Sequence, residues 1–222
     1  MIRTNMIDWN DVDTVLLDMD GTLLDLHFDS YFWLEYVPQK YAEKHSISLE
    51  QSKTELKPRF EQTYGKLEWY CLDYWGKELD LDIVALKREL SHLISFRPDA
   101  DLFLHNLKER GKEVIMITNA HRDSLSLKLE RLSMAHYFDK LISSHDYGYP
   151  KELQAFWYEL EAAIGLNKER ALFIDDSLPV LDSAKEYGIK HLLTIQYPDS
   201  KKGAKDIGDY ESVEDFQHLI QA

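Results

Sequence analysis

Three short apolar runs, each closed by polar residues, constrain the fold of this chain more than any other feature. The runs cover residues 15–17, 114–117 and 171–174, and they are followed by Asp18-Met19-Asp20-Gly21-Thr22, Thr118-Asn119 and Asp175-Asp176-Ser177. Apolar runs of about four residues favour strands over helices and suit strands that are buried on both faces. Because a helical pattern follows each run, the sequence predicts an α/β fold with a Rossmann-like parallel sheet, flanked by helices.

The expected elements can be placed along the chain by their apolar patterns and by the glycines that follow helices. Strands are expected at 13–19, 114–117, 171–174 and 191–195, helices at 100–110, 123–133, 152–164 and 180–187, and an exposed loop at 198–208 before a short closing helix. Between about 26 and 96 the chain has helical patterns, many Tyr and Trp residues, and no convincing buried strand.

In a parallel sheet, the carboxyl ends of the strands meet at one edge, where open α/β folds bind their ligands. Four carboxylates, a hydroxyl and an amide are therefore expected to converge there, and the turn Gly148-Tyr149-Pro150-Lys151 is expected to add a lysine. Acids two residues apart, such as Asp18 and Asp20, repel each other unless a cation, a shared proton or a reacting group lies between them. Because 40 of the 222 residues are acidic, one such pair could arise by chance. The pair alone could therefore also be a solvated strand end.

The ordered set of Asp18 to Thr22, Thr118, Lys151 and Asp175-Asp176 resembles the four motifs of the haloacid dehalogenase superfamily, most of whose members are magnesium-dependent phosphohydrolases. The chain resembles one branch more closely, the GMP/IMP nucleotidases. The segments that carry this closer resemblance are 17–26, 31–33, 69–75, 118–121 and 148–152. The resemblance implies an α/β core made of residues 1–25 and 96–222, with an inserted all-helical cap at 26–95.

The resemblance also implies roles that agree with the chemistry of phosphate-ester hydrolysis. Asp18 is expected to be the nucleophile that forms an aspartyl-phosphate, and Asp20 the general acid and base. Mg²⁺ is expected to bind to Asp18, Asp175 and the backbone carbonyl of Asp20, because it prefers oxygen ligands. Asp176 either holds a metal-bound water or pairs with Lys151. The sequence suggests no Cys/His cluster for zinc or iron.

Phosphate is expected to contact Thr118 and Lys151, whereas Asn119 either orients phosphate or caps the next helix. A substrate pocket is expected to use some of the cap aromatics, Trp33, Trp69 and Tyr70. Such aromatic stripes also arise from simple helix packing, but a purine base stacks well on these rings. His121 is expected at the pocket mouth or in a capping or surface role. His145 and Cys71 show no partner in the sequence and are interpreted as structural.

The net charge of −14 argues against a general nucleic-acid or anionic-membrane surface. A single cysteine, no run resembling a signal peptide and no long apolar stretch together predict a cytoplasmic protein. The leading hypothesis is a Mg²⁺-dependent enzyme that hydrolyses purine 5′-monophosphates. The alternatives are a phosphatase for a sugar phosphate or phosphoglycolate, and a non-catalytic phosphate-binding domain.

Overall fold

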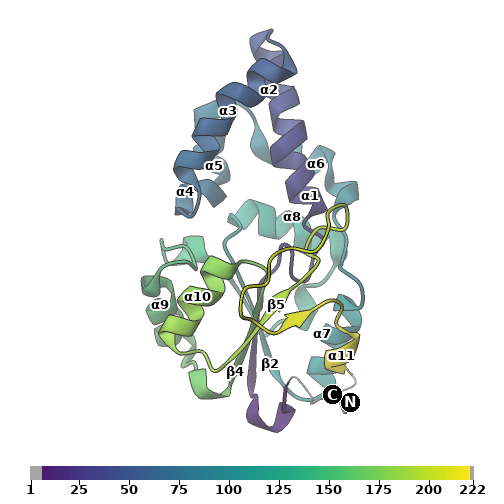
Figure 1. Cartoon of the computed structure of the whole chain (residues 1–222), viewed down its shortest axis with the longest axis vertical. Helices are drawn as coiled ribbons and strands as arrows, with labels where there is room; N and C mark the ends of the chain where they lie inside the picture. The colour runs from purple at the N-terminus through teal and green to yellow at the C-terminus, as the bar shows by residue number, and fades with distance from the viewer. Residues whose placement is uncertain (1–6, 221–222) are drawn as a thin grey trace.

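The computed structural model describes residues 7–220, and its centre is a sheet of six parallel strands (Figure 1). The spatial order is β3-β2-β1-β4-β5-β6. The strands are β1 (Thr14–Leu17), β2 (Glu113–Thr118), β3 (Lys140–Ser143), β4 (Ala171–Asp175), β5 (His191–Ile195) and β6 (Ser212–Val213). This arrangement confirms the predicted Rossmann-like α/β class.

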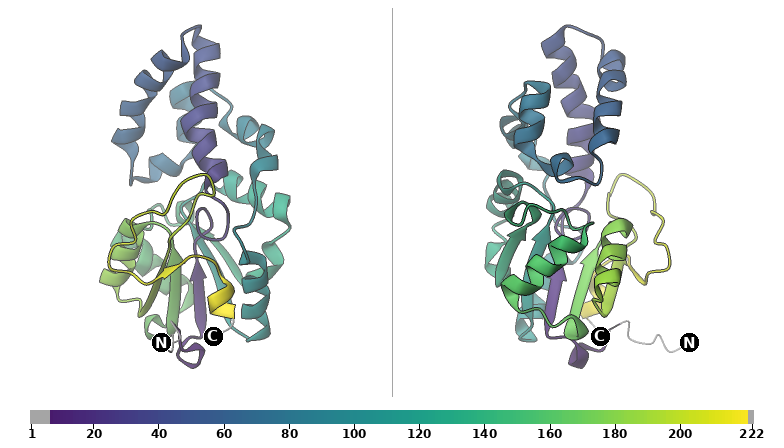
Figure 2. Two further views of the ribbon diagram at one scale, coloured as in Figure 1. Left: turned by 45° about the vertical axis from the view of Figure 1, so that its right-hand side comes forward. Right: turned by 90° about the vertical axis from the view of Figure 1, so that its left-hand side faces the viewer.

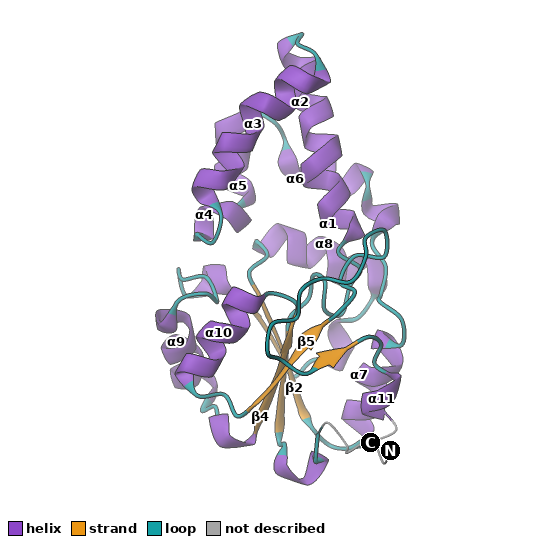
Figure 3. Ribbon diagram, in the orientation of Figure 1, coloured by secondary structure: helices purple, strands orange, loops and turns teal. Residues whose placement is uncertain are grey.

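Successive side chains of each strand point to opposite faces of the sheet, and both faces are buried. Val15 and Leu17 of β1 pack into one apolar cluster, whereas Leu16 belongs to a second cluster on the opposite face. Helices cover both faces (Figure 3). The core helices are α7 (Ala100–Glu109), α8 (Arg122–Leu132), α9 (Gln154–Ile164), α10 (Leu178–Tyr187) and α11 (Gln217–Ile220). Because each face is covered, the strands are continuously apolar, which is why their short runs were visible in the sequence.

The expected and observed elements differ mainly at strand ends and at the sheet margins. The strand expected over 13–19 ends at Leu17, so Asp18, Met19 and Asp20 lie in the turn that follows it. β5 and the closing helix were expected, and the four larger core helices begin and end within two residues of their predicted positions. β3 and β6 were not predicted, because their short segments lack the four-residue apolar run of the central strands.

The segment between β1 and α7 is helical and lies beyond the carboxyl edge of the sheet (Figures 1 and 2). Its main helices are α1 (His27–Tyr31), the π-helix Phe32–Tyr36, α2 (Val37–His45), α3 (Leu49–Thr63), α4 (Leu67–Tyr70), α5 (Leu72–Leu79) and α6 (Ile83–Glu89). The outgoing and returning chains meet at an antiparallel bridge between Leu24 and Phe96. None of the helices in residues 7–220 is long and apolar enough to cross a lipid bilayer.

Aromatic side chains hold this helical segment together. Trp75 of α5 is fully buried, its ring lies 5.1 Å from Phe60 and 5.8 Å from Trp33, and its Nε1 donates to the Trp69 carbonyl at 2.9 Å. Such a cluster contributes burial energy and specific ring contacts. The packing explanation for the aromatic stripes is therefore correct for Trp75, whereas Trp33 and Trp69 also have a face on the cavity described next.

Candidate active site

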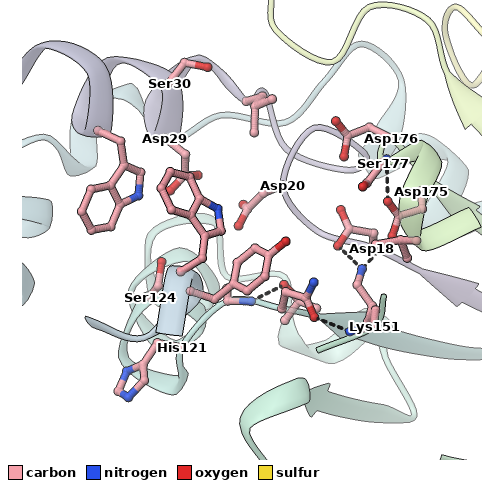
Figure 4. Close-up of a pocket in the computed structure, with 18 of the residues that line it drawn as sticks. Asp18, Asp20, Asp29, Ser30, His121, Ser124, Lys151, Asp175, Asp176 and Ser177 are labelled. Carbon is pink, nitrogen blue, oxygen red and sulfur yellow. Dashed lines mark hydrogen bonds and ion pairs between the residues drawn. The ribbon is translucent and has the colours of Figure 1, made fainter. Parts of the chain in front are cut away.

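Three strand ends place the predicted acidic and polar residues at the middle of the carboxyl edge (Figure 4). β1 lies between β2 and β4, with Leu17 in register with Met116 and Ile174, so Asp18 lies close to Thr118 and Asp175. A cavity of about 330 Å³ opens above this point. It is lined by all the residues predicted for the site: Asp18, Asp20, Trp33, Trp69, Tyr70, Thr118, Asn119, His121, Lys151, Asp175 and Asp176.

Lys151 is the buried cation at the centre of the site. Its Nζ donates to Asp18 Oδ1 at 2.6 Å, to Asp175 Oδ2 at 2.7 Å and to the Ile117 carbonyl at 3.1 Å. Although burial disfavours the ammonium form, Asp175 and Asp18 raise the pKa of Lys151 above its usual value. The lysine therefore stays charged.

Two side chains hold the backbone of Lys151 in place. Asn119 Oδ1 accepts a hydrogen bond from the Lys151 amide, and Trp157 Nε1 donates to the Lys151 carbonyl, each at 2.9 Å. Asn119 does not cap helix α8, because the residue that begins the helix and accepts from its first turn is His121. The capping alternative for Asn119 is thus wrong, and its amide instead positions the lysine.

Three carboxylates crowd around this lysine. Burial raises the pKa of Asp18 to about 6 against the opposing effect of Lys151, and burial likewise raises the pKa of Asp175. Asp176 has its pKa raised to about 7, by burial and by Asp175. Its carboxylate lies 3.6 Å from Lys205 Nζ, so its described ion pair is with Lys205 rather than with Lys151.

The donor set at this point fits Mg²⁺. One oxygen from each of Asp18, Asp175 and Asp176 lies within 4.8 Å of the others, with no nitrogen or sulfur ligand in the group. Mg²⁺ takes oxygen ligands and typically only a few from protein. Burial raises the pKa of Asp18 and of Asp176, and a divalent cation bound among these carboxylates would favour their charged forms.

Gly21 allows the turn after Asp20 to pass beside these acids. Its φ is +85°, and a Cβ atom built there would lie 2.8 Å from Asp176 Cγ. Any other residue would be strained in its backbone and would also displace that carboxylate. The glycine therefore permits the close approach of the Asp20 turn to Asp176.

Asp20 is held by a lysine that the sequence analysis missed. Its Oδ1 accepts from Lys128 Nζ of α8 at 2.6 Å, and the same ammonium donates to Asp29 Oδ2 at 2.6 Å. Asp29 in turn accepts from Lys87 Nζ of α6 at 2.7 Å. A row of alternating charges therefore connects the helical segment to Asp20. The sequence offered one sign of this row. Lys87 of α6 and Lys128 of α8 each lie among the apolar residues of the buried helix face, near Leu86 and Leu125.

The charge states along this row follow from burial and from the neighbouring charges. Burial raises the pKa of Asp20 to about 6, although Lys128 acts in the opposite direction. For Asp29, burial also favours the neutral acid, but Lys128 and Lys87 outweigh it and bring the pKa to about 2. Asp29 is thus a permanent anion between two cations, whereas Asp20 has an intermediate pKa suited to exchanging a proton.

We predict that Lys128→Met lowers the free energy of unfolding by about 3–5 kcal/mol, because it leaves the Asp20 carboxylate without its buried partner and Asp29 with Lys87 alone. The Lys128 side chain is 1% exposed, so little water is available to compensate. Lys140→Met is the matched control, since Lys140 is 41% exposed and lies 3.8 Å from Glu113. That exposed pair contributes about 0–1 kcal/mol. Urea unfolding of both variants tests this, and equal losses would contradict it.

The side of the cavity formed by the helical segment is mainly aromatic. Trp33, Trp69 and Tyr64 line it, together with Tyr70, whose hydroxyl donates to Glu152 Oε1 at 2.6 Å. Burial and Glu152 raise the pKa of Tyr70, so the phenol stays protonated. The sequence analysis did not include Tyr64, which is largely exposed and has no distinguishing pattern.

His121 lines the cavity and caps α8, which combines two of its predicted roles. Its Nδ1 accepts from the Asp123 amide at 3.4 Å, and Figure 4 shows its ring far from Asp18. The expectation that the chain has no Cys/His cluster is wrong. Cys71, His121 and His145 each offer one ligand atom, and these atoms lie within 4.8 Å of one another. They come from three distant segments, so local spacing could not indicate the cluster.

Comparisons with known proteins agree with this geometry. A family model described as haloacid dehalogenase-like hydrolase matches residues 12–188. The chain is 44% identical over 214 residues to the GMP/IMP nucleotidase YrfG of Escherichia coli K12, and the alignment covers 96% of each chain. The structure of a HAD phosphatase from Thermococcus onnurineus superposes with a TM-score of 0.78 at 22% identity, covering 95% of this chain and 97% of that one. This structural similarity shows that the two chains share a fold.

Proposed function

The chain belongs to the haloacid dehalogenase-like hydrolase family and is a phosphoric monoester hydrolase, and we propose that it hydrolyses purine nucleoside 5′-monophosphates, with GMP and IMP as substrates. One observation carries the proposal: a single cavity has Lys151 among three carboxylates at its base and Trp33 and Trp69 in its wall. The charged floor of the cavity suits a phosphoryl group, and the aromatic wall suits a flat purine ring. Residues 26–95 then act as a cap over a core of 1–25 and 96–222.

The first step transfers the phosphoryl group to Asp18. Since Lys151 binds Oδ1, Oδ2 is the oxygen that attacks phosphorus, while Lys151 and the Thr118 hydroxyl neutralise and orient the phosphoryl oxygens. The bond from phosphorus to the sugar 5′ oxygen breaks as the aspartyl-phosphate bond forms. Asp20 gives its proton to the departing oxygen, which suits its pKa of about 6.

The second step releases phosphate. Asp20, now a carboxylate, removes a proton from the attacking water, the aspartyl-phosphate bond breaks, and Asp18 returns to its starting form. Lys128 holds the Asp20 carboxylate in one orientation for both proton transfers. Mg²⁺ would be held by Asp18, Asp175 and the Asp20 carbonyl, with Asp176 beside them, and when bound it supplies positive charge that balances the phosphoryl oxygens.

A substrate panel tests the function. We expect kcat/KM for GMP and IMP to exceed that for CMP and for small sugar phosphates by at least about 10-fold, because only a purine covers the aromatic wall, at about 1–3 kcal/mol per stacked base. We also expect turnover with excess EDTA to fall to background and to return with Mg²⁺. Phosphate release, measured with purified protein, provides both values.

Two results would contradict the proposal. A preference for a sugar phosphate or phosphoglycolate over GMP would keep the chemistry and exclude the purine substrate, which is the first alternative. Absence of turnover with every monoester in Mg²⁺ would favour the non-catalytic phosphate-binding alternative.

Trp69→Ala distinguishes a stacking role of Trp69 from a packing role. If Trp69 stacks on the purine, the variant should have a higher KM for GMP and unchanged turnover of a small phosphate ester.

A further inference from the structure

Cys71, His121 and His145 form a cluster that the hydrolysis of a phosphate ester does not use. Cys71 lies between α4 and α5 of the helical segment, His121 precedes α8, and His145 lies in the short 3₁₀ turn Ser144–Asp146. One ligand atom from each lies within 4.8 Å of the others. The cluster thus joins the helical segment to two loops of the core.

The His145 ring is prepared to act as a ligand. Its Nε2 is buried and has no hydrogen-bond partner among the described residues. Burial and the neighbouring His121 lower the pKa of His145, which favours the neutral ring, while the backbone of Asn119 acts in the opposite direction. A neutral imidazole with a free ring nitrogen is a common metal ligand.

Cys71 supplies a soft sulfur ligand. Its Sγ accepts from the Tyr74 amide at 3.4 Å, at the amino end of the eight-residue helix α5, which fixes the position of the sulfur. Cys71 also lines a crevice of about 460 Å³ together with His145, which gives an ion a path from solvent.

His121 and Asp73 complete the surroundings. His121 Nε2 lies 3.7 Å from Asp73 Oδ2 and its Nδ1 lies 3.6 Å from Asp123 Oδ2. If Nε2 binds an ion, Nδ1 carries the proton and exchanges its 3.4 Å bond from the Asp123 amide for one to the Asp123 carboxylate. The exposed Asp73 is near enough to provide a fourth ligand or to bond a water that does.

We propose that Cys71, His121 and His145 form a second metal site, selective for Zn²⁺, which restrains the helical segment and slows turnover. Sulfur and imidazole ligands favour Zn²⁺, whereas the oxygen-only group around Lys151 favours Mg²⁺. Each ion is therefore expected to bind at its own site. Tetrahedral Zn²⁺ places such ligands about 3.5 Å apart. Because the ligand atoms already lie within 4.8 Å of one another, each pair needs to approach by little more than an ångström at most.

The effect on turnover follows from what the ion would connect. Cys71 directly follows Tyr70, which lines the substrate cavity, and His121 lines it too. An ion bound between them links the aromatic wall to the core. Substrate exchange in capped sites depends on such elements moving. The inhibition depends on the proposed function, but the metal site itself does not.

Direct binding with Co²⁺ tests the site. The full chain, reduced with a non-chelating phosphine and saturated with Mg²⁺, is titrated with Co²⁺ and the complex is then displaced by Zn²⁺. We expect a thiolate-to-cobalt charge-transfer band that saturates at one equivalent. Cys71→Ser and His145→Asn are expected to lose the band and to bind Zn²⁺ at least about 100-fold more weakly, since even supporting residues contribute 10–100-fold.

These two variants preserve the local structure. Serine is a good helix N-cap, so Cys71→Ser keeps the bond to Tyr74, and asparagine keeps a donor near the position of His145 Nδ1. Both are expected to retain GMP turnover without Zn²⁺ and to lose its inhibition. A missing cobalt band in the unaltered chain would overturn the proposal. Zn²⁺ affinity unchanged in Cys71→Ser would also overturn it and would place the ion among the carboxylates.

Discussion

Asp18→Asn is expected to reduce GMP turnover by about 10⁴- to 10⁶-fold, the range found when a catalytic nucleophile is removed. The amide has the shape of the carboxylate but cannot form the covalent intermediate. Lys151 keeps its 2.7 Å contact with Asp175, so the base of the site should stay assembled. The measurement is single-turnover kinetics with GMP, together with acid trapping of phosphorylated protein.

Asp175→Asn is the matched control, because Asp175 and Asp18 contact the same lysine at nearly equal distances. This variant loses a charge next to Lys151 yet keeps the nucleophile. It is expected to form the phosphorylated protein when Mg²⁺ is raised, whereas Asp18→Asn should form none at any Mg²⁺ concentration. Phosphorylated protein in Asp18→Asn would show that another residue is the nucleophile.

The sequence predicted the acidic residues at the base of the site because their positions depend on strands alone. Val15 to Leu17 and Ala171 to Ile174 are continuously apolar, and such runs become neighbouring parallel strands whose ends lie together. Asp18 and Asp175 are therefore brought close by topology, which a single sequence can suggest. The turn with Lys151 follows no apolar run of this kind, and the family resemblance strengthened its assignment to the same edge.

The parts that could not be predicted depend on contacts between distant helices. Lys87, Asp29 and Lys128 come from three helices and form one buried row only after the helical segment packs on α8. Burying these charges would be unfavourable without their partners, so propensity and pattern alone assign each lysine to solvent. The same holds for Cys71 and His145, which are separated by more than seventy residues and meet where the helical segment contacts the core.

The role of Asp20 leads to the second large effect. Asp20→Asn is expected to reduce GMP turnover by about 10²- to 10⁴-fold, the usual contribution of a positioned acid or base. With 4-nitrophenyl phosphate, whose leaving group needs no proton, the first step should be nearly unaffected while the second step loses its base. The variant should therefore release a burst of about one nitrophenol per protein molecule, followed by slow turnover.

Lys128 provides the control for this result, since it contacts Asp20 at 2.6 Å but has no proposed contact with substrate. Lys128→Met frees the Asp20 carboxylate without removing it. With GMP both steps should therefore slow, whereas with 4-nitrophenyl phosphate only the second step should slow, and by less than in Asp20→Asn. If Asp20→Asn lost activity equally with GMP and with 4-nitrophenyl phosphate and showed no burst, Asp20 would not be the proton donor. Its carboxylate would then act only through its charge beside Lys128, and the proton donor would have to be another group lining the cavity.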